Sequence, residues 1–553
     1  MKKVLIALAV LGVLGLAGVA IFLRSGGPAQ AAAIAPADSS IFLNIPNIPL
    51  TGFRWTSTAL ARIAAEPEVR AFLEKPLANA GGQSSTQEAG THLAAVKPGN
   101  IFASIAPGDG GASVLIGFQF WGGKSDYEKA VARLREALTA ALEGPTTKNH
   151  SNIEIVSTKH GSTEVHSAAV GRWGLLSNDL AGLESAIDRA LGNKPGGGLD
   201  SNERFKKTIA ALPGSPDLVA FVQPAGAVGT LSSSPIPAAA QAAARMNSLG
   251  TAEAIGAALK LDGELQRDAI FILKPGTKKP ASNPPPGSIQ FTTPSTVVFA
   301  RDFSTGFDDI ASRLRGLAEA YPAFPVELLA LTEALSGACG PEAALIADWP
   351  EGALAPSPLL AIETPDADRA REALSVLATL LPGSVLEESG GLQTLSLPTQ
   401  FTPVSIAQGR GYLLAAIDPA RLVAAANADP GKSTLESSPS FKSALPAFRH
   451  ANSAFCYIDT AAAFERLHAT FVPVLRFTAA MVPSIGENVD VSKIPSAATI
   501  SKHLPPIVLS RSDTAGGVLV ESSGPISMGQ LVILGAAGFT AANPGILKSL
   551  LEP

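Results

Sequence analysis

The strongest constraint on the fold is a pattern that the chain contains twice. The string ARLREAL, which begins at Ala132, returns as DRAREAL from Asp368. The same offset relates two further pairs of segments: Phe205-Lys206 with Phe441-Lys442, and Val219–Val222 with Phe455–Ile458. A spacing that is kept over so much of the chain indicates a tandem duplication, whereas one shared string would indicate only a local motif.

A proline-rich stretch separates the two copies. From Lys274 to Ser288 the chain reads KPGTKKPASNPPPGS, and its prolines and glycines oppose regular structure. The sequence therefore predicts the following organisation: a transmembrane or signal segment over 1–24, a linker over 25–35, a first module over 36–273, a proline-rich linker over 274–292, a second module over 293–523 and a C-terminal helical segment over 524–553.

Each copy is predicted to be an α+β module with mainly antiparallel sheets and covering helices. In the first copy a helix over about 57–74 precedes two apolar runs, NIFASIA and SVLIGFQF, which the turn PGDGGA would join as a hairpin. The helix with the repeated string places Leu138 on its apolar face, and Leu374 is the equivalent residue in the second copy. The repeated Arg and Glu residues then face solvent, so the string indicates architecture and not an active site.

The N-terminus carries an apolar run of membrane-spanning length. Val4–Leu23 contains no charged residue, and a helix of that length is about 30 Å long, like the hydrocarbon core of a bilayer. Because Lys2 and Lys3 precede the run, we expect a single-pass inner-membrane protein with its body outside the cytoplasm. The alternative is a cleaved signal, since cleavage after Ala31, at Ala29-Gln30-Ala31, would leave a secreted or periplasmic protein.

Charge and motifs argue against nucleic-acid and nucleotide partners. The net charge of −5 offers no basic surface for phosphates. The string GKST at 431–434 resembles the end of a phosphate-binding loop, but Ala426 stands where that loop needs its first glycine, and the preceding residues are helical in pattern. Neither partner is therefore predicted.

Other chemical signals are equally weak. His160 and His166 flank a predicted turn without a carboxylate placed beside them, and the acidic pair Asp308-Asp309 suits the start of a helix. Cys339 and Cys456 could pair outside the cytoplasm, although the apolar surroundings of Cys456 favour a buried thiol. We predict no catalytic, cofactor-binding or metal-binding residue, and no cofactor.

Three strings resemble a known family. APADSSIFLNIPNI near the start, EPEVRAFLEKP from Glu66 and ISKHLPPIVLSRSDTAGGVLVESSGP from Ile500 look like an uncharacterised family of bacterial envelope proteins that carry a domain of unknown function. This resemblance implies tandem α+β modules behind an N-terminal hydrophobic segment. It implies no active-site residue.

These observations favour a membrane-anchored extracytoplasmic protein with a non-catalytic binding or structural role. Its expected contacts are the membrane, through residues 4–23, and a protein of the cell envelope. An extracytoplasmic hydrolase with a site at the module interface is the first alternative. A carrier of an apolar ligand is the second. An enzyme should show a polar constellation in only one copy, a scaffold should show exposed apolar patches, and a carrier should show a cavity between sheet and helices.

Overall fold

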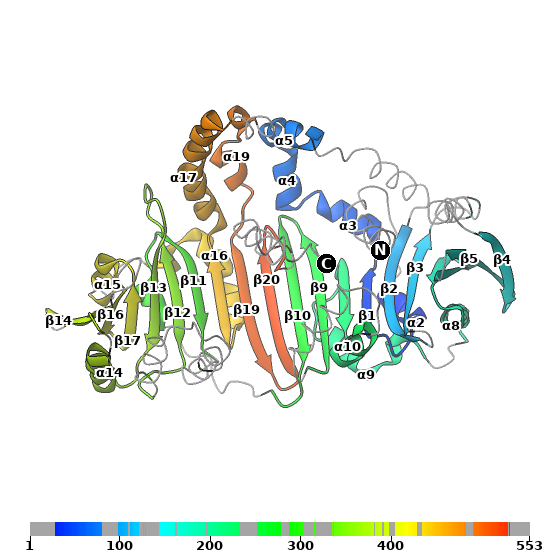
Figure 1. Cartoon of the computed structure of the whole chain (residues 1–553), viewed down its shortest axis with the longest axis horizontal. Helices are drawn as coiled ribbons and strands as arrows, with labels where there is room; N and C mark the ends of the chain where they lie inside the picture. Colours follow the sequence, from blue (N-terminus) through cyan, green and yellow to red (C-terminus); the bar gives the residue numbers. More distant parts are fainter. Residues whose placement is uncertain are drawn as a thin grey trace. The chain divides into compact units, whose positions relative to one another are not determined.

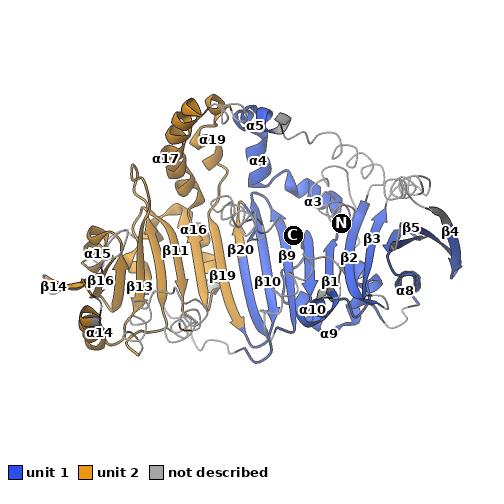
Figure 2. Cartoon of the chain, viewed as in Figure 1, with its two compact units in different colours: residues 1–277, 514–521, 526–553 blue, residues 278–513, 522–525 orange. Residues whose placement is uncertain are grey.

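The computed structural model of the chain describes the following residues: 28–79, 98–108, 111–120, 125, 128, 143–160, 163–193, 197–232, 252–277, 287–303, 315, 335, 337–380, 382–389, 392–397, 404–427, 434–482, 490–528 and 530. The chain forms two compact units, which Figure 2 shows in different colours. Unit 1 comprises residues 1–277, 514–521 and 526–553, and unit 2 comprises residues 278–513 and 522–525. Each unit is a mixture of helices and antiparallel strands (Figure 1).

The described strands of unit 1 form one antiparallel sheet. They are β1 (Ile41–Ile45), β2 (Pro98–Gly108), β3 (Gly111–Phe120), β4 (Glu143–His150), β5 (Ile153–His160), β6 (Thr163–Val170), β7 (Trp173–Ser177), β8 (Leu218–Val222), β9 (Ala254–Asp262) and β10 (Leu265–Leu273). Their order across the sheet is β4-β5-β6-β7-β3-β2-β1-β8-β9-β10. Tight turns join several neighbours, and Ser151 and Asn152 have positive φ, as a two-residue hairpin turn requires.

The core of unit 1 lies between this sheet and a set of helices. The described helices are α2 (Pro28–Ile34), α3 (Ile48–Trp55), α4 (Ala59–Ala65), α5 (Pro67–Asn79), α8 (Leu180–Ala190), α9 (Glu203–Ala210) and α10 (Pro224–Ser232), with a 3₁₀ turn η1 (Leu199–Ser201). Alternate strand residues such as Phe42, Phe102 and Phe221 point to one face, where α2, α8 and α9 cover them. Phe205 of α9 packs edge-on against Phe42 and Phe221.

Unit 2 has a second antiparallel sheet. Its strands are β11 (Thr296–Asp302), β12 (Ala343–Asp348), β13 (Ser357–Glu363), β14 (Val385–Ser389), β15 (Leu392–Leu397), β16 (Val404–Gly409), β17 (Tyr412–Ala416), β18 (Ala454–Ile458) and β19 (Ile507–Thr514), followed by β20 (Gly517–Gly524), whose residues up to Glu521 group with unit 1. The order in unit 2 is β14-β15-β16-β17-β13-β12-β11-β18-β19. This is the order found in unit 1 from β4 to β9, strand for strand.

Helices lie on both faces of the unit 2 sheet. They are α14 (Ala367–Leu380), α15 (Pro419–Ala426), α16 (Pro439–His450), α17 (Thr460–Met481) and α19 (Ala497–Ser501), with 3₁₀ turns η2 (Gly287–Phe291), η3 (Leu435–Ser437) and η4 (Val491–Lys493). The core that contains Leu414 includes residues of α15 and α16, whereas the core that contains the adjacent Leu413 includes residues of α14. Because neighbouring strand residues point to opposite faces, these two cores lie on opposite sides of the sheet.

Several expectations meet the described residues. The hairpin of β2 and β3 is confirmed, and the helix expected over 57–74 is two helices, because the chain is extended at Glu66 before Pro67. A linker is predicted over 25–35, but residues 28–34 form α2, and Ala31 and Ala32 are fully buried in the core. Likewise η2 occupies part of the linker predicted over 274–292.

Other expectations lie outside the described part of the chain. These concern the apolar run 4–23, the helix that contains Leu138 and the C-terminal segment beyond residue 530. Leu374, the predicted counterpart of Leu138, is fully buried on α14, and the charged side chains of Arg369 and Arg371 are exposed. Within the residues that the structure describes, no helix has both the length and the apolarity to span a bilayer.

Candidate functional site: buried polar clusters and an exposed apolar helix

The most concentrated polar cluster of unit 2 surrounds Glu342. This residue immediately precedes β12, and its Oε1 accepts hydrogen bonds from Arg301 Nε on β11 at 2.8 Å and from Ser288 Oγ at 2.5 Å. The backbone N–H of Ser288 also donates to Oε1, at 3.3 Å, and the Tyr412 hydroxyl donates to Oε2 at 2.7 Å. The side chains of Arg301 and Glu342 are 2% and 4% exposed, so this ion pair is shielded from water.

The geometry of this cluster suits structure and not catalysis. A carboxylate has about four lone-pair positions, and four donors reach Glu342, so it has little capacity left to accept a substrate proton. Burial lowers the pKa of Arg301 while Glu342 opposes that shift, and burial together with the Glu342 hydrogen bond raises the pKa of Tyr412. Tyr412 therefore remains a neutral donor to the carboxylate, and the Arg301 guanidinium lies over the ring of Phe303, 4.1 Å from its centroid.

Unit 1 has an uncharged pair at the corresponding ladder positions. In unit 2, Val298 pairs with Ala347 and Ile458, and in unit 1, Ile41 pairs with Ile105 and Val222. Counting along the strands from these pairs places Asn44 where unit 2 has Arg301, and Asn100 where it has Glu342. Asn44 is fully buried, and its Nδ2 donates to Asn100 Oδ1 at 2.6 Å. One unit thus holds an ion pair where the other holds an amide pair.

Other buried carboxylates also bind neighbouring elements together. In unit 1, Asp217 accepts from Arg54 on α3 and from the backbone N–H of Leu261 on β9, at 3.1 and 2.8 Å. In unit 2, Asp348 accepts from the Thr296 hydroxyl and lies 2.8 Å from Arg421 Nε. Each of these carboxylates therefore holds a helix or a strand in place.

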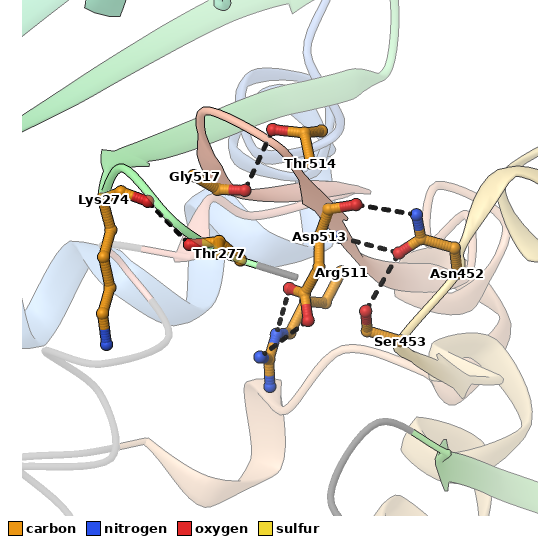
Figure 3. A network of polar contacts seen from close by, with 8 residues as sticks. All are labelled: Lys274, Thr277, Asn452, Ser453, Arg511, Asp513, Thr514 and Gly517. Carbon is orange, nitrogen blue, oxygen red and sulfur yellow. Dashed lines mark hydrogen bonds and ion pairs between the residues drawn. The ribbon is translucent and has the colours of Figure 1, made fainter. Parts of the chain in front are cut away.

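An asparagine joins the ends of two strands in unit 2. The Nδ2 of Asn452, just before β18, donates to the backbone oxygen of Asp513 on β19, while its Oδ1 accepts from the backbone N–H of Asp513 (Figure 3). Ser453 donates to the same Oδ1, and Arg511 pairs with the Asp513 carboxylate at 3.0 Å. The Asn452 side-chain amide thus makes the two hydrogen bonds that a backbone amide would make in the β18–β19 pairing. The same figure shows that Thr514 Oγ1 donates a hydrogen bond to the backbone oxygen of Gly517, across the turn between β19 and β20.

An arginine in each unit fixes the segment that precedes the first strand. Arg189 of α8 donates from Nε to the oxygen of Ile34, the last residue of α2, at 2.7 Å. In unit 2, Arg421 of α15 donates from Nη2 to the oxygen of Phe291, at the end of η2, at 2.6 Å. Burial lowers the pKa of Arg189, which is nevertheless positioned at the negative end of the α2 backbone. α2 is therefore an integral part of unit 1.

The histidines singled out from the sequence are not brought together as a pair. His160 lies opposite Thr163, and His166 lies opposite Ser157, three positions further along the β5–β6 ladder. Ser157 Oγ and His166 Nδ1 are 2.8 Å apart, and both residues are buried. Within the described residues no carboxylate is hydrogen-bonded to this imidazole, so the contact is that of a satisfied core histidine.

The remaining sequence candidates are two cysteines, a glycine-lysine string and an acidic pair. Cys339 and Cys456 form no disulfide with one another, and burial raises the pKa of the Cys456 thiol to about 11. In the part of the chain that the structure covers, no group of His, Cys, Asp and Glu has a metal-binding arrangement. Residues 428–433 and the pair Asp308-Asp309 lie outside the described residues. The preceding α15 is helical as predicted.

The most unusual surface in unit 2 is that of α17. This helix has 22 residues, none of them buried. Hydrogen bonds hold its first half: Thr460 donates to the Pro505 oxygen, Ser501 donates to Glu465, and His468 bonds the Pro495 oxygen at 2.8 Å. The second half exposes large apolar side chains: Phe471, Val474, Leu475, Phe477, Met481 and, at the C-cap, Val482. Scattered apolar exposure is normal, but a continuous patch marks an interaction site.

The fold and these sites define a two-unit α+β protein whose described buried charges serve structure and whose unit 2 presents an apolar helix. Residues 125–490 match the family DUF3352, described as a protein of unknown function. This match spans more than half of the chain, so the chain belongs to this family. The sequence-based resemblance to an uncharacterised family with a domain of unknown function is confirmed.

Other comparisons add little. No curated protein matches the chain. Crystal form III of TP0453 aligns at a TM-score of 0.25 and 9% identity, over 45% of this chain and 80% of that one. Crystal form I of the same protein gives a TM-score of 0.23 and 8% identity, over 45% of this chain and 79% of that one. Likeness this weak carries no inference about fold or function.

Proposed function

We propose that the protein is a membrane-anchored extracytoplasmic protein with a non-catalytic binding role, built from two homologous modules. The observation that carries the proposal is the contrast in unit 2 between its polar and apolar groups. The Glu342 carboxylate is buried and saturated by four donors, whereas half of α17 offers apolar side chains to the solvent. Such a surface suits binding, and such a carboxylate does not suit acid or base chemistry.

The shared strand order supports the tandem duplication. β1 lies between β2 and β8 in unit 1, and β11 lies between β12 and β18 in unit 2. In the same way, β7 pairs with β3 and β6, and β17 pairs with β13 and β16. Equivalent arginine contacts to Ile34 and Phe291 add a detail that strand order alone would not require. The substitution of the Asn44–Asn100 pair by Arg301–Glu342 is then a divergence between two copies.

The place of α2 supports retention of the N-terminal segment. Cleavage after Ala31 would remove the first four residues of α2, including Ala31 itself, which is fully buried in the unit 1 core. A signal peptide normally ends before the folded domain begins. The apolar run 4–23 therefore acts as a membrane anchor, with the two units on the far side from Lys2 and Lys3.

Fractionation of the native cell tests the anchor. We expect the full-length protein to remain in the membrane pellet after a carbonate wash and its body to be digested by protease once the outer layers are opened. A mature N-terminus at Ala32, or a body that protease cannot reach, would refute the proposed location. Turnover of chromogenic esters, glycosides or phosphoesters by the purified protein would instead support the alternative, a hydrolase with its site at the module interface.

A carrier of apolar ligands is a second candidate, favoured by the other face of the unit 1 sheet. Leu43 of β1 lies on that face in a row with Ile116 of β3 and Ile270 of β10, and the residues between them in the row are also apolar. Leu43 is 36% exposed and the other two are half-buried. Titration with a fluorescent fatty acid tests this role: saturable binding that Ile116→Asn weakens would support it, and no binding would exclude it.

A further inference from the structure

α17 is amphipathic from its middle to its C-terminal end. Leu467, Phe471, Val474, Leu475 and Met481 follow one another at helical spacings that place them on one side. By the same spacing, Glu465 and Arg476 fall on the opposite side, and Arg466 lies at the border between the two sides. Phe471 is 61% exposed and Met481 is 70% exposed, so this face has no cover among the described parts of the chain.

The helix suits a surface and not a passage through a membrane. Three charged residues within its 22 positions oppose full insertion. α17, like every other described helix, is not long and apolar enough to span a bilayer. A helix with an apolar face of Phe, Leu and Met residues and arginine on the other side has the properties of a helix that lies in the interface, with its apolar face among the acyl chains. Arg476 is exposed on the polar side of the helix, which in this orientation faces the lipid headgroups and the water.

We infer that α17 docks on the surface of a lipid bilayer, with Phe471 and its neighbours inserted below the headgroups. The inference rests on the proposed function, because the apolar run 4–23 would hold the protein at that bilayer. Only residues 24–27 separate the end of this run from the start of α2, so the chain that carries α17 is confined near lipid. Confinement of this kind raises the effective concentration of the second, weaker contact.

The first half of α17 positions this contact. Its hydrogen bonds to Ser501, Pro495 and Pro505 fix the helix to residues 490–505 of the same unit. Pro473 lies between the two halves. Because proline has no N–H to donate to the preceding turn, one backbone hydrogen bond between the two halves is missing. The first half of α17 is thus fixed to unit 2, and it holds the apolar second half at the surface.

An environment-sensitive label on each side of α17 tests the inference. The full-length protein with Cys339→Ser and Cys456→Ala receives a single cysteine by Phe471→Cys, or by Ala469→Cys as the control, since Ala469 is exposed on the opposite side. Circular dichroism first establishes that both variants fold. Each is labelled with a nitrobenzoxadiazole dye and reconstituted into vesicles of phosphatidylcholine with a minority of phosphatidylglycerol, with and without nitroxide lipids.

We expect the label at position 471 to lie about 5 to 10 Å below the headgroups and to be quenched by acyl-chain nitroxides, while the label at 469 stays in water. Water exposure at 471 in reconstituted protein would overturn the inference. So would a label at 471 that is shielded from both water and lipid quenchers, because a second copy or another protein would then cover α17. Carbonate extraction of the same vesicles reports on residues 4–23 alone, so retention with a water-exposed 471 refutes this inference and leaves the anchor intact.

Discussion

The ion pair of unit 2 and the amide pair of unit 1 make a quantitative prediction about buried charge. Arg301→Asn leaves the Glu342 carboxylate with the Ser288 and Tyr412 donors but without a positive partner, at a place that is 4% exposed. Removal of one partner from a buried pair costs about 3 to 5 kcal/mol, because the other charge stays buried. Glu342→Asn removes the carboxylate that pairs with Arg301 and should also destabilise unit 2.

The double variant should recover much of this loss. Arg301→Asn with Glu342→Asn reproduces the pair formed by Asn44 and Asn100, in which one amide donates to the other at 2.6 Å. A neutral pair has no charge to desolvate, and replacement of a whole buried ion pair is often close to neutral. We expect a coupling energy of at least about 2 kcal/mol between the two substitutions.

Hydrogen exchange measures these energies locally. A large chain with two units need not unfold in one step, so opening free energies are read from the amides of β11 and β12 in the full-length protein in detergent. Arg371→Asn is the control, because Arg371 pairs with Asp368 on the exposed side of α14 and should cost less than about 1 kcal/mol. If Arg301→Asn costs no more than this control, or if the double variant costs the sum of the single variants, the reasoning about buried charge is wrong.

Three further predictions concern single groups. The N-terminal peptide of the mature protein should begin upstream of Pro28, because α2 is part of the core, and mass spectrometry of the native protein decides this. Cys456, with a pKa near 11, should be alkylated by iodoacetamide at pH 8 only after unfolding in urea, since about one thiol in a thousand is ionised in the folded protein. Hydrogen bonds from His150 and Ser151 lower the pKa of Asp188, so the contact between the β4–β5 hairpin and α8 should stabilise the hairpin above the usual carboxyl pKa of 3.8 and weaken as the pH falls through the lowered value. Exchange rates in β4 should show this loss, and Asp188→Asn should remove the pH dependence.

Local sequence patterns predict the elements whose cause is local. The hairpin of β9 and β10 follows from Asp262-Gly263, because Gly263 has a φ of +61° that glycine adopts without strain. Asp179, a residue type common at helix starts, stands at the N-cap of α8, although its side chain makes no capping hydrogen bond. The break between α4 and α5 depends on Pro67, which restricts the residue before it, and a helix drawn through this position ignores that restriction.

The polar clusters and the apolar surface could not be predicted in the same way. Arg301 directly follows the apolar run Val297–Ala300, and Glu342 directly precedes the apolar run Ala343–Ala347, but nothing in the sequence says that the two residues meet. The spacing of Phe471 and Met481 predicts an apolar side of α17, whereas it does not predict whether another element covers that side. Which side chains distant in sequence contact one another depends on the strand order of the sheet, and local patterns do not determine that order.

The central place of β1 has a consequence for the time at which each unit can fold. β1 is one of the first elements to be synthesised, yet its second neighbour, β8, follows only after residues 46–217. β11 and β18 repeat this arrangement in unit 2. Sheets closed by such distant pairings form slowly, because a long loop must close before the contacts are gained. In the export that we propose for this chain, such a delay would keep each unit unfolded until its last strands had crossed the membrane.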